Sequence, residues 1–553
     1  MKKYVAALIL ITLVGLGFRL FIALRLPNDA PDDGRLYSQI ARNVLEHRSY
    51  SIETEDPYPP TYIRVPGYPL FLAGVYSLFG HENDRAVRVV QAILDTLTCW
   101  LIALLAVAWA PAGWDGQKRR KLLPIALTLA VCCPFPAIYI ATILTETCTT
   151  LLATACALAG TLALKTANLA KSGGWLLLAG LSGGVATLFR PDSGLFVAAV
   201  GFTIVVVGLY RIVFRQNPAE PVSNDVLTGT RRHIFNRTVL SGAMLTLGFV
   251  ISLTPWTIRN ARVFGVFQPI CPAQANMPGE FVPNGYIGWL KTWVSDVHYT
   301  ELIEFPLDQD QIHIEDMPDS AFDSPEERQR VARLLDQYNH PPSAQPQIPA
   351  PEAKKAGTDA GSQPDESESD DDESGAADAD ESDDSDKPEE PEAKQPVEMT
   401  PEVDAGFAEL ARERIARNPL RYHVIVPLKR VGSMWFDTHA QYYPFEGELL
   451  PLSSLDTDLH QQYWLPLFAF LTLLYTCLGL AGLWLMWRDK ASRRWLLMLV
   501  LLTVPRLVLL SKMENPEPRY VVEYFAFVAA VGAIAIVAGY DRVRAKKSIE
   551  FTH

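Results

Sequence analysis

The sequence predicts a mainly α-helical, polytopic membrane protein with about ten or more transmembrane helices. Of the 553 residues, 49% are hydrophobic, and many gather in blocks of about 17–22, the length that a helix needs to cross a hydrocarbon core of roughly 30 Å. Lipid offers the backbone no hydrogen-bond partners, so such blocks must be helices. One long hydrophilic region interrupts them, and there we expect an external α/β or mixed domain.

Ten spans can be placed along the chain. They cover 4–24, 87–108, 122–140, 141–164, 174–189, 194–214, 239–255, 464–487, 495–510 and 521–539. A further apolar block at 66–79 is too short for a full span and fits a re-entrant or interfacial helix. The first block shows no small-residue cleavage pattern before Pro27, so we expect a retained first span rather than a signal peptide.

Lys and Arg residues near the span ends predict the orientation of the chain. If ten spans are present, the basic clusters all fall on one side of the membrane: 118–121, 165–171, 211–237, 488–494 and 542–547. Loops rich in Lys and Arg stay in the cytoplasm. We therefore expect a multi-pass protein of the bacterial inner membrane with both termini in the cytoplasm.

The chain is expected to have three parts. Residues 1–256 form an N-terminal transmembrane domain whose first external loop is 25–85, residues 257–463 form an external (periplasmic) region, and residues 464–553 form C-terminal transmembrane helices with a short cytoplasmic tail. The external region contains an acidic insert at 341–396 that is too poor in apolar residues to fold, so it should be disordered.

The net charge and the cysteines exclude some classes of function. The whole chain carries −13, but residues 352–392 alone carry −15, so the remainder is near +2 and the acidity belongs to the insert. No nucleic-acid partner is expected. Six of the seven cysteines lie in or at the ends of apolar blocks, and no CxxC pair or Cys/His ligand spacing appears, so neither a disulfide framework nor a zinc site is indicated.

Two carboxylates open a helical pattern in the first external loop. Apolar residues recur at helical spacing from Leu36 to Leu45, and Asp32 and Asp33 stand at the cap position of that helix. A helix on the membrane surface would hold both carboxylates at the level of the lipid headgroups. They are either an ordinary N-cap or a catalytic group, and the spacing to Tyr37 favours Asp33 over Asp32.

Two more polar residues lie where the chain re-enters the apolar phase. Arg64 precedes the turn Pro66-Gly67-Tyr68-Pro69 and stays at the interface, where snorkelling is the alternative interpretation. Glu146 lies just inside the external end of a span, and an ionisable residue at membrane depth is a functional hypothesis by default.

Three arginines occur at external span ends, where Lys and Arg are usually scarce. They are Arg190, Arg259 and Arg519. The guanidinium group matches phosphate through two parallel, charge-assisted hydrogen bonds. Carboxylates beside phosphate-binding arginines suit a reaction in which a phosphate leaves a sugar's anomeric carbon while a carboxylate deprotonates the attacking acceptor.

Five short motifs occur one after another along the chain, from the first loop to the last span. They are Asp33-Gly34-Arg35-Leu36-Tyr37-Ser38-Gln39-Ile40-Ala41-Arg42-Asn43, Arg64-Val65-Pro66-Gly67-Tyr68-Pro69, Leu144-Thr145-Glu146, Pro255-Trp256-Thr257-Ile258-Arg259-Asn260 and Pro518-Arg519-Tyr520. Together they resemble GT-C fold glycosyltransferases of the dolichyl-phosphate-mannose-protein mannosyltransferase type, which include the bacterial lipid A aminoarabinose transferases. The acidic insert has no expected counterpart in that family.

The resemblance implies an inverting glycosyltransferase that uses a polyprenyl-phosphate-linked sugar donor and a lipid, glycan or protein acceptor among the membrane lipids. It makes Asp33 or Asp32 the candidate base and Glu146 a second carboxylate in the external cavity. Candidate ligands for phosphate or acceptor are Arg64, Tyr37, Arg190, Arg259, Arg519 and Tyr520. No metal cage is evident, and dependence on a divalent cation differs within the group, so that dependence stays open.

Two other classes of protein would share parts of this pattern. A transporter or flippase for lipid-linked sugars would place polar groups near the bilayer midplane, often in two related halves, whereas no repeat occurs here and the polar residues cluster at one face. A polysaccharide polymerase or ligase would depend on arginines without an essential carboxylate in the first loop.

Overall fold

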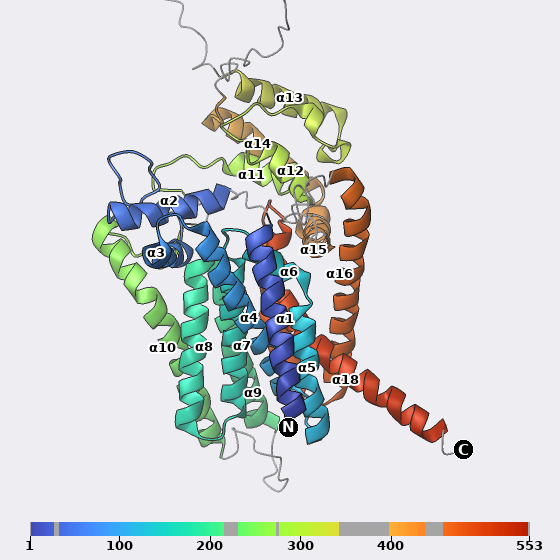
Figure 1. Ribbon diagram of the computed structural model, residues 1–553. Helices are drawn as coiled ribbons and strands as arrows, with labels where there is room; N and C mark the ends of the chain where they lie inside the picture. Colours follow the sequence, from blue (N-terminus) through green and yellow to red (C-terminus); the bar gives the residue numbers. More distant parts are fainter. Residues whose placement is uncertain are drawn as a thin grey trace, which may run out of the picture. The chain divides into compact units, whose positions relative to one another are not determined.

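The computed structural model describes residues 2–26, 32–214, 230–272, 276–341, 397–436 and 457–550, and in these ranges all regular elements are helices (Figure 1). The predicted mainly α-helical class is therefore confirmed. The strands expected in the external region do not occur in its described residues, and that part of the prediction is wrong. The predicted disorder of the acidic insert concerns residues that, from 342 to 396, lie outside the described ranges.

The chain divides into two compact units. The first comprises Met1–Val282, Val294–Val297 and Pro419–His553, and the second comprises Pro283–Trp293 and His298–Asn418. The second unit therefore lies within the region predicted to be external, 257–463.

The first unit contains the apolar helices. In chain order its main helices are α1 (Lys2–Arg25), α2 (Asp32–Glu46), α3 (Gly67–Phe79), α4 (Asp84–Trp109), α5 (Gly116–Val131), α6 (Pro134–Ala137), α7 (Glu146–Lys165), α8 (Leu169–Phe189), α9 (Gly194–Phe214), α10 (Arg231–Phe264), α15 (Val426–Phe436), α16 (Thr457–Arg488), α17 (Arg493–Leu510) and α18 (Tyr524–Glu550). Short helical turns η1 (Ile138–Ile140), η2 (Pro191–Ser193), η6 (Arg421–Ile425) and η7 (Pro518–Val521) lie between them.

Eight of these helices are long and apolar enough to span a membrane, judged by the described residues. They lie in α1, α4, α7, α8, η2 with α9, α10, α16 and α18; the bent pair of α5 with α6–η1 is either a ninth, broken span or a re-entrant loop. The multi-pass prediction is confirmed. The remaining predicted span, 495–510, corresponds to α17, which carries three arginines within its 18 residues (Arg493, Arg494 and Arg506) and is not among these candidate spans.

The chain between α5 and α7 differs from the sequence prediction. The span expected at 122–140 is broken by a bend of 51° between Val131 and Pro134. Proline has no N–H to donate to the preceding turn, so Pro134 begins a new helix instead of continuing the old one. The span expected from Ala141 begins only at Glu146, which places that carboxylate in the first turn of α7.

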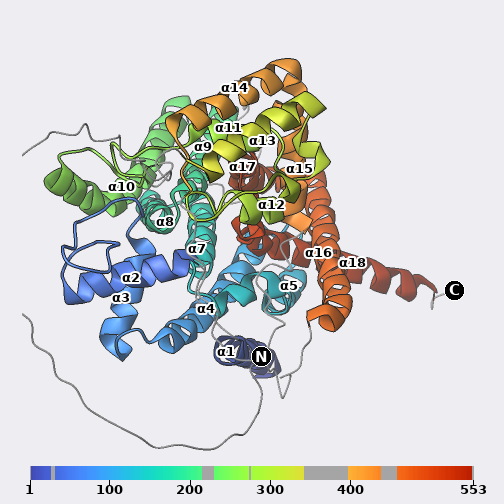
Figure 2. The ribbon, with the colours of Figure 1, turned by 90° about the horizontal axis from the view of Figure 1, so that it is seen from above.

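The helix α7 is central in the first unit, between α4 and α8 (Figure 2). On the other side of α8, the helix α10 packs close because glycines line the crossing. A Cβ atom at Gly180 would lie 2.1 Å from the Leu245 carbonyl oxygen, and one at Gly248 would lie 2.3 Å from that of Leu177. Small residues allow such close helix–helix contact inside lipid.

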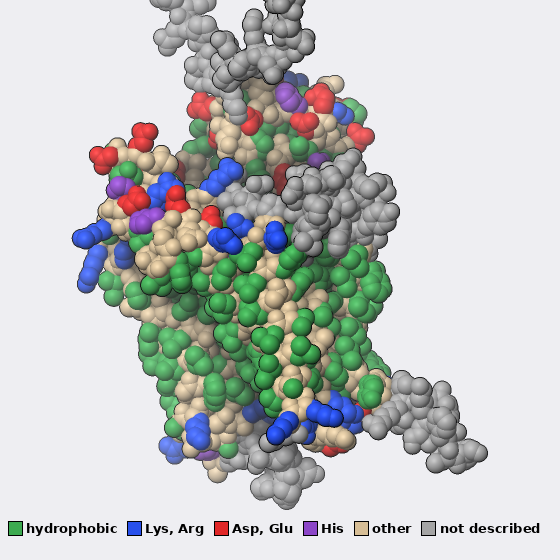
Figure 3. Space-filling view, in the orientation of Figure 1, with side chains coloured by type: hydrophobic (Ala, Val, Ile, Leu, Met, Phe, Trp, Pro, Cys, Tyr) green, Lys and Arg blue, Asp and Glu red, His purple; other side chains and the backbone are tan. Residues whose placement is uncertain are grey.

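Two helices of the first unit do not run with the others. The amphipathic helix α2 lies across the upper ends of the long helices, and the short helix α3 packs beside it (Figures 1 and 2). The predicted short apolar block at 66–79 is thus α3 and does not span by itself. At the opposite ends of the long helices, Lys and Arg side chains follow a broad apolar band (Figure 3).

The second unit is built from α11 (Asn284–Leu290), most of α12 (Val297–Ile303), α13 (Pro325–Asn339) and α14 (Pro401–Arg417). Its core contains Trp289, Tyr286, Phe407, Leu335 and Val331, all buried. The apolar positions of α13 and α14 recur every three or four residues, which is the helical rather than the strand period and explains the absence of the expected mixed fold.

Candidate active site

A partly exposed carboxylate, Asp33, lies between two arginines at the start of α2. Its Oδ2 is 2.9 Å from Nη2 of Arg519, and its Oδ1 is 3.4 Å from Nη2 of Arg64. The Asp33 side chain keeps 27% of its surface exposed. Three segments far apart in sequence therefore meet at one carboxylate that solvent or a ligand can still reach.

The loop after α2 fixes the position of Arg64. The buried Asn43 amide donates to the carbonyl oxygens of Ser51 and Glu53 at 2.9 and 2.8 Å, which folds the loop back on α2. The Tyr50 hydroxyl then donates to the carbonyl oxygen of Arg64 at 3.2 Å. These contacts give the motif from Asp33 to Asn43 a structural role at its end and a charged role at its start.

The glycine of the Arg64 motif permits a close approach of α3 to α8. A Cβ atom at Gly67 would lie 2.5 Å from the carbonyl oxygen of Leu188, closer than real Cβ atoms come to backbone. Arg190 follows two residues after that carbonyl. The glycine therefore allows the segments that carry Arg64 and Arg190 to come together.

A second carboxylate, Glu517, orients Arg519. Both Nε and Nη2 of Arg519 bond to Glu517, the Nη2–Oε1 distance being 3.0 Å. Glu517 also accepts hydrogen bonds from Asn515, at 2.5 Å, and from the Tyr520 hydroxyl, at 3.1 Å. Glu517 is buried and fixes Arg519, whose Nη2 donates to both Glu517 and Asp33.

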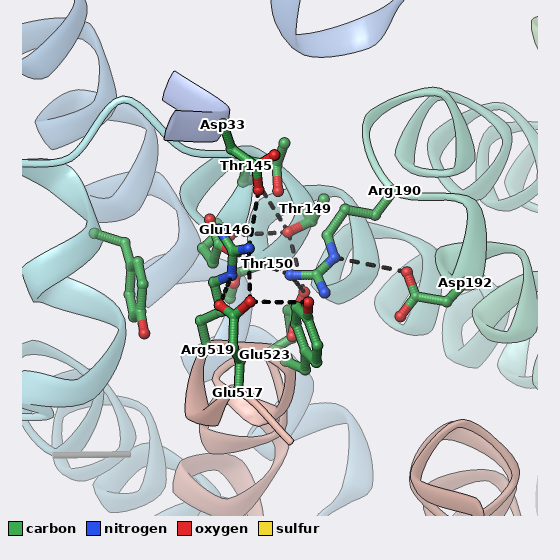
Figure 4. Close-up of polar contacts among 12 residues, drawn as sticks. Asp33, Thr145, Glu146, Thr149, Thr150, Arg190, Asp192, Glu517, Arg519 and Glu523 are labelled. Carbon is green, nitrogen blue, oxygen red and sulfur yellow. Dashed lines mark hydrogen bonds and ion pairs between the residues drawn. The ribbon is translucent and has the colours of Figure 1, made fainter. Parts of the chain in front are cut away.

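Glu146 lies in the same group, at the first turn of α7 (Figure 4). Its Oε1 accepts a hydrogen bond from Nη1 of Arg190 at 3.0 Å. Its Oε2 is buried and has no hydrogen-bond partner among the described residues. The side chain is only 2% exposed. One oxygen of this carboxylate is therefore fixed, and the other is a buried acceptor without a partner among the described residues.

Arg190 belongs to a ring of four alternating charges below Asp33. Its Nε is 3.6 Å from Asp192, whose other oxygen is 2.6 Å from Nε of Arg506. Arg506 then bonds to Glu523 at 3.1 and 3.3 Å, and Glu523 closes the ring at 3.9 Å from Arg190. Two arginines and two carboxylates neutralise each other in this ring, so Glu146 is an additional negative group attached to it.

A hydroxyl group of α7 also contacts the ring of charges formed by Arg190, Asp192, Arg506 and Glu523. The Thr149 hydroxyl lies 3.1 Å from Oε1 of Glu523 and can donate to it. Figure 4 shows Thr149, Glu146 and Arg190 converging between Asp33 and Glu523. The ends of α7, α8, α17 and α18 are thus linked by polar contacts directly under the exposed carboxylate.

Electrostatics keep Asp33 ionised. Burial by itself would raise the pKa of Asp33, but Arg519 and Arg64 outweigh it and hold that pKa below the usual value for an aspartate. Burial, followed by the charge of Asp33, raises the pKa of the Tyr37 phenol above its usual value. Asp33 is therefore an anion and Tyr37 a neutral hydroxyl at neutral pH.

The structure brings most of the sequence-predicted residues together: Asp33, Arg64, Glu146, Arg190, Arg519 and Tyr520. Tyr37 lies at the edge of the group, with its ring against Tyr68 at a centroid distance of 5.4 Å. Asp32 is the first residue of α2, but its side chain lies outside the described part of the structure.

Arg259 lies apart from the carboxylates. Its Nη1 donates to the carbonyl oxygen of Thr61 at 2.7 Å, and its guanidinium lies 4.8 Å from the ring centroid of Trp256. It borders a groove of about 700 Å³. The groove is lined by Val44, Arg48, Ser49, Tyr50, Pro60, Pro66, Leu70, Leu188, Ser252, Pro255, Trp256, Arg259 and Val263. Because Tyr50 and Pro66 line it, the groove begins next to the segment that carries Arg64.

Four charged residues of the cluster were not among the sequence-predicted site residues: Asp192, Arg506, Glu517 and Glu523. A signal for two of them was present, because Arg506 and Glu523 interrupt runs predicted to span the membrane. Among the described residues, no group of three or more His, Cys, Asp or Glu could hold a metal ion.

Comparison with known proteins gives one match to a family. Residues 60–219 match the family model described as dolichyl-phosphate-mannose-protein mannosyltransferase, so the resemblance seen in the motifs is confirmed for this part of the chain. The search of curated proteins found no match to the chain.

Several solved structures share a distant overall likeness. The oligosaccharyltransferase AglB of Archaeoglobus fulgidus, in complex with an inhibitory peptide and a dolichol-phosphate, is 12% identical with a TM-score of 0.44, over 98% of this chain and 52% of that one. ArnT of Cupriavidus metallidurans bound to undecaprenyl phosphate is 13% identical with a TM-score of 0.34, over 96% and 77%. This chain spans about half the length of the archaeal enzyme.

Proposed function

We propose that this chain is an inverting glycosyltransferase of the GT-C type. It would move a sugar from a polyprenyl-phosphate-linked donor to a lipid, glycan or protein acceptor at the external face of a bacterial inner membrane. The observation that carries the proposal is Asp33: a carboxylate that is 27% exposed, ionised, and flanked by two arginines at the ends of apolar helices.

In the proposed reaction Asp33 is the general base. An acceptor hydroxyl gives its proton to an Asp33 oxygen as the hydroxyl oxygen attacks the anomeric carbon. The bond between that carbon and the phosphate oxygen breaks, and the phosphate leaves with the electron pair. Attack opposite to the leaving group inverts the anomeric centre, and no covalent sugar–enzyme intermediate is needed.

The same arginines would serve both the phosphate and the base. Arg64 and Arg519 form ion pairs with Asp33, which lowers its pKa and makes it a weak proton acceptor. Guanidinium groups bind phosphate through charge-assisted hydrogen bonds. A donor phosphate that takes over these two arginines would free Asp33 and restore its basicity at the moment the acceptor needs it.

The other predicted residues fit supporting roles. Arg190 and the unpartnered Oε2 of Glu146 suit contacts to the sugar or the acceptor, with Tyr37 and Tyr520 at the edge. The groove beside Arg259 offers apolar walls to a polyprenyl chain. With two arginines available to neutralise the phosphate, this proposal leaves a divalent cation optional.

The proposed orientation follows from charge. Lys and Arg side chains gather at the ends of the long helices opposite to α2, which carries Asp33 (Figures 1 and 3), and loops rich in Lys and Arg stay in the cytoplasm. Asp33 would then face the periplasm. A flippase for lipid-linked sugars and a polysaccharide polymerase or ligase are the alternatives, and neither predicts a first-loop carboxylate as the essential group.

The test is product formation by the purified full chain in proteoliposomes with polyprenyl-phosphate sugars and candidate acceptors. We expect released polyprenyl phosphate, an inverted glycosidic product, and a loss of at least about 100-fold in Asp33→Asn. Glu55→Gln, an exposed change in the same external loop as Asp33, is the matched control and should retain full activity. Movement of the donor across the bilayer without any release of polyprenyl phosphate would contradict the proposal and favour a flippase.

A further inference from the structure

A second cavity lies at the opposite ends of the membrane helices. It has a volume of about 520 Å³ and is bordered by the turn after α4, the start of α5, the end of α16 and the end of the span in α18. Its lining combines apolar groups, among them Trp114 and Leu485, with Lys118, Arg488 and Arg542. The proposed transfer reaction makes no use of this cavity.

Two arginines of the cavity converge without a carboxylate between them. The guanidinium of Arg488 lies 4.5 Å from the ring centroid of Trp484, and that of Arg542 lies 6.0 Å from the same ring. Neither makes an ion pair with a described residue. Two positive groups beside one aromatic ring make a site of positive potential, which an anion would stabilise.

The two acidic residues of the cavity are already engaged. Asp489 accepts hydrogen bonds from the Ser492 hydroxyl at 2.6 Å and from the Ala491 amide at 3.2 Å. Asp541 is paired with Lys121 at 3.0 Å and with Lys118 at 3.6 Å. Neither carboxylate pairs with Arg488 or Arg542, and the three cationic residues of the lining outnumber its two carboxylates, which leaves the cavity with a net positive charge.

An apolar stripe leads from the cavity along the lipid-facing side of α16. Leu480, Trp484 and Arg488 follow one another at intervals of four residues, so they lie on one face of the helix, and Leu480 and Trp484 are exposed. Leu480 lies about 12 Å along the helix from Arg488. That length is close to one leaflet of a hydrocarbon core of roughly 30 Å.

We propose that this cavity binds the phosphate headgroup of an anionic phospholipid, with an acyl chain along the stripe of α16. The arginines would hold the phosphate oxygens, and Trp484 would lie between headgroup and chain, where tryptophan is enriched in membrane proteins. Basic pockets between helices at the cytoplasmic face are suited to anionic lipid headgroups. The site is independent of the proposed transferase reaction.

The experiment measures lipid retention by the purified full chain. The protein is equilibrated with mixed micelles containing phosphatidylglycerol or phosphatidylcholine, and bound lipid is counted by native mass spectrometry. We expect wild type to retain phosphatidylglycerol in preference to phosphatidylcholine, and the double variant Arg488→Gln/Arg542→Gln to bind phosphatidylglycerol about tenfold more weakly. Arg488→Lys/Arg542→Lys should restore part of the affinity because it keeps the charge.

The control is Lys490→Gln/Arg493→Gln, which removes two positive charges from the adjacent turn without touching the cavity lining. It should bind phosphatidylglycerol as wild type does, and all variants should melt at the same temperature in lipid-free detergent. Equal weakening in the control would reduce the effect to general surface charge and overturn the site. Equal retention of phosphatidylcholine, or displacement of phosphatidylglycerol by millimolar inorganic phosphate, would also overturn a lipid headgroup site.

Discussion

Two arginine–carboxylate ion pairs in the first unit differ in how much of each side chain is exposed. Arg19 of α1 and Asp95 of α4 are 2.6 Å apart and only 1% and 2% exposed, in the middle of two apolar helices. Arg519 and Asp33 are 2.9 Å apart and 12% and 27% exposed, at helix ends. Both pairs join distant parts of the chain, yet only the second can exchange its partner.

The Arg19 guanidinium is fully used within the protein. Besides Asp95 it donates to the carbonyl oxygens of Gly15 and Val131, both at 3.3 Å, and contacts the Cys99 sulfur at 3.0 Å. The cavity beside it, about 10 Å³, has room for about one water molecule. A charge buried in this way holds helices together, whereas a site needs groups like Asp33 whose bonds a substrate can replace.

The largest expected effect is a loss of stability when the buried Arg19–Asp95 pair is broken. Asp95→Asn would leave Arg19 buried without a counter-charge, and breaking a buried ion pair costs about 3–5 kcal/mol. We expect a markedly lower melting temperature and a poor yield of folded protein in detergent. Normal thermal stability of this variant, measured by intrinsic fluorescence, would contradict the claim that the Arg19–Asp95 pair stabilises the packing of the helices.

The next largest effect is expected on kcat/KM for the donor, when the partly exposed Arg519–Asp33 pair is changed. Arg519→Gln would remove one charge-assisted contact to the donor phosphate, a contribution of about 1.5–3 kcal/mol, so kcat/KM should fall by about 10- to 100-fold. Because this change also leaves the buried Glu517 without its ion-pair partner, the melting temperature should fall too, and the kinetics are compared on protein shown to be folded. Steady-state kinetics with varied donor concentration make the comparison, and an unchanged kcat/KM would exclude Arg519 from phosphate binding.

A smaller effect is expected at Glu517, which orients Arg519. Glu517→Gln keeps the shape of the side chain but removes its charge, so Arg519 is held less firmly and turns more strongly to Asp33. We expect kcat/KM to fall by about fivefold to tenfold, mainly through KM for the donor. A fall in kcat alone, with donor KM unchanged, would contradict a positioning role through Arg519.

The smallest effect concerns the pH profile. Asp33 has a lowered pKa, so its ionised form persists below the usual titration range of aspartate and is lost only as the pH falls through that lowered value. Arg64→Gln removes one of the two arginines that lower the pKa, so the acid limb of kcat/KM should move to higher pH. An acid limb that moves to lower pH, or stays in place, would show that Arg64 does not act on Asp33.

The sequence predicted the apolar helices well because length and hydropathy are local properties. It missed the break before Pro134 and the late start of α7 at Glu146, since a proline-rich apolar stretch fits a bent pair as well as a straight span. It also predicted strands in the external region, where the described residues form helices whose apolar period becomes clear only once their partners in the core are known.

The sequence predicted many residues of the candidate site, but it did not predict which of them contact one another. Asp33, Glu146 and Arg519 stand out in sequence because charges at external helix ends are unusual. The pairing of Arg506 with Asp192 joins residues 314 positions apart, and that of Arg19 with Asp95 depends on the rotation of two helices. Such contacts are set by packing, so the sequence could not separate the structural charges from the exchangeable ones.

The central claim is that Asp33 takes the proton from the acceptor, and Asp33→Asn tests it most directly. Asparagine keeps the size and loses the basic oxygen, and a general base contributes about 10²- to 10⁴-fold to a rate. We predict a loss of that size in single-turnover transfer with saturating donor, with donor binding and melting temperature retained. Transfer at the wild-type rate by folded, donor-bound Asp33→Asn would contradict the account.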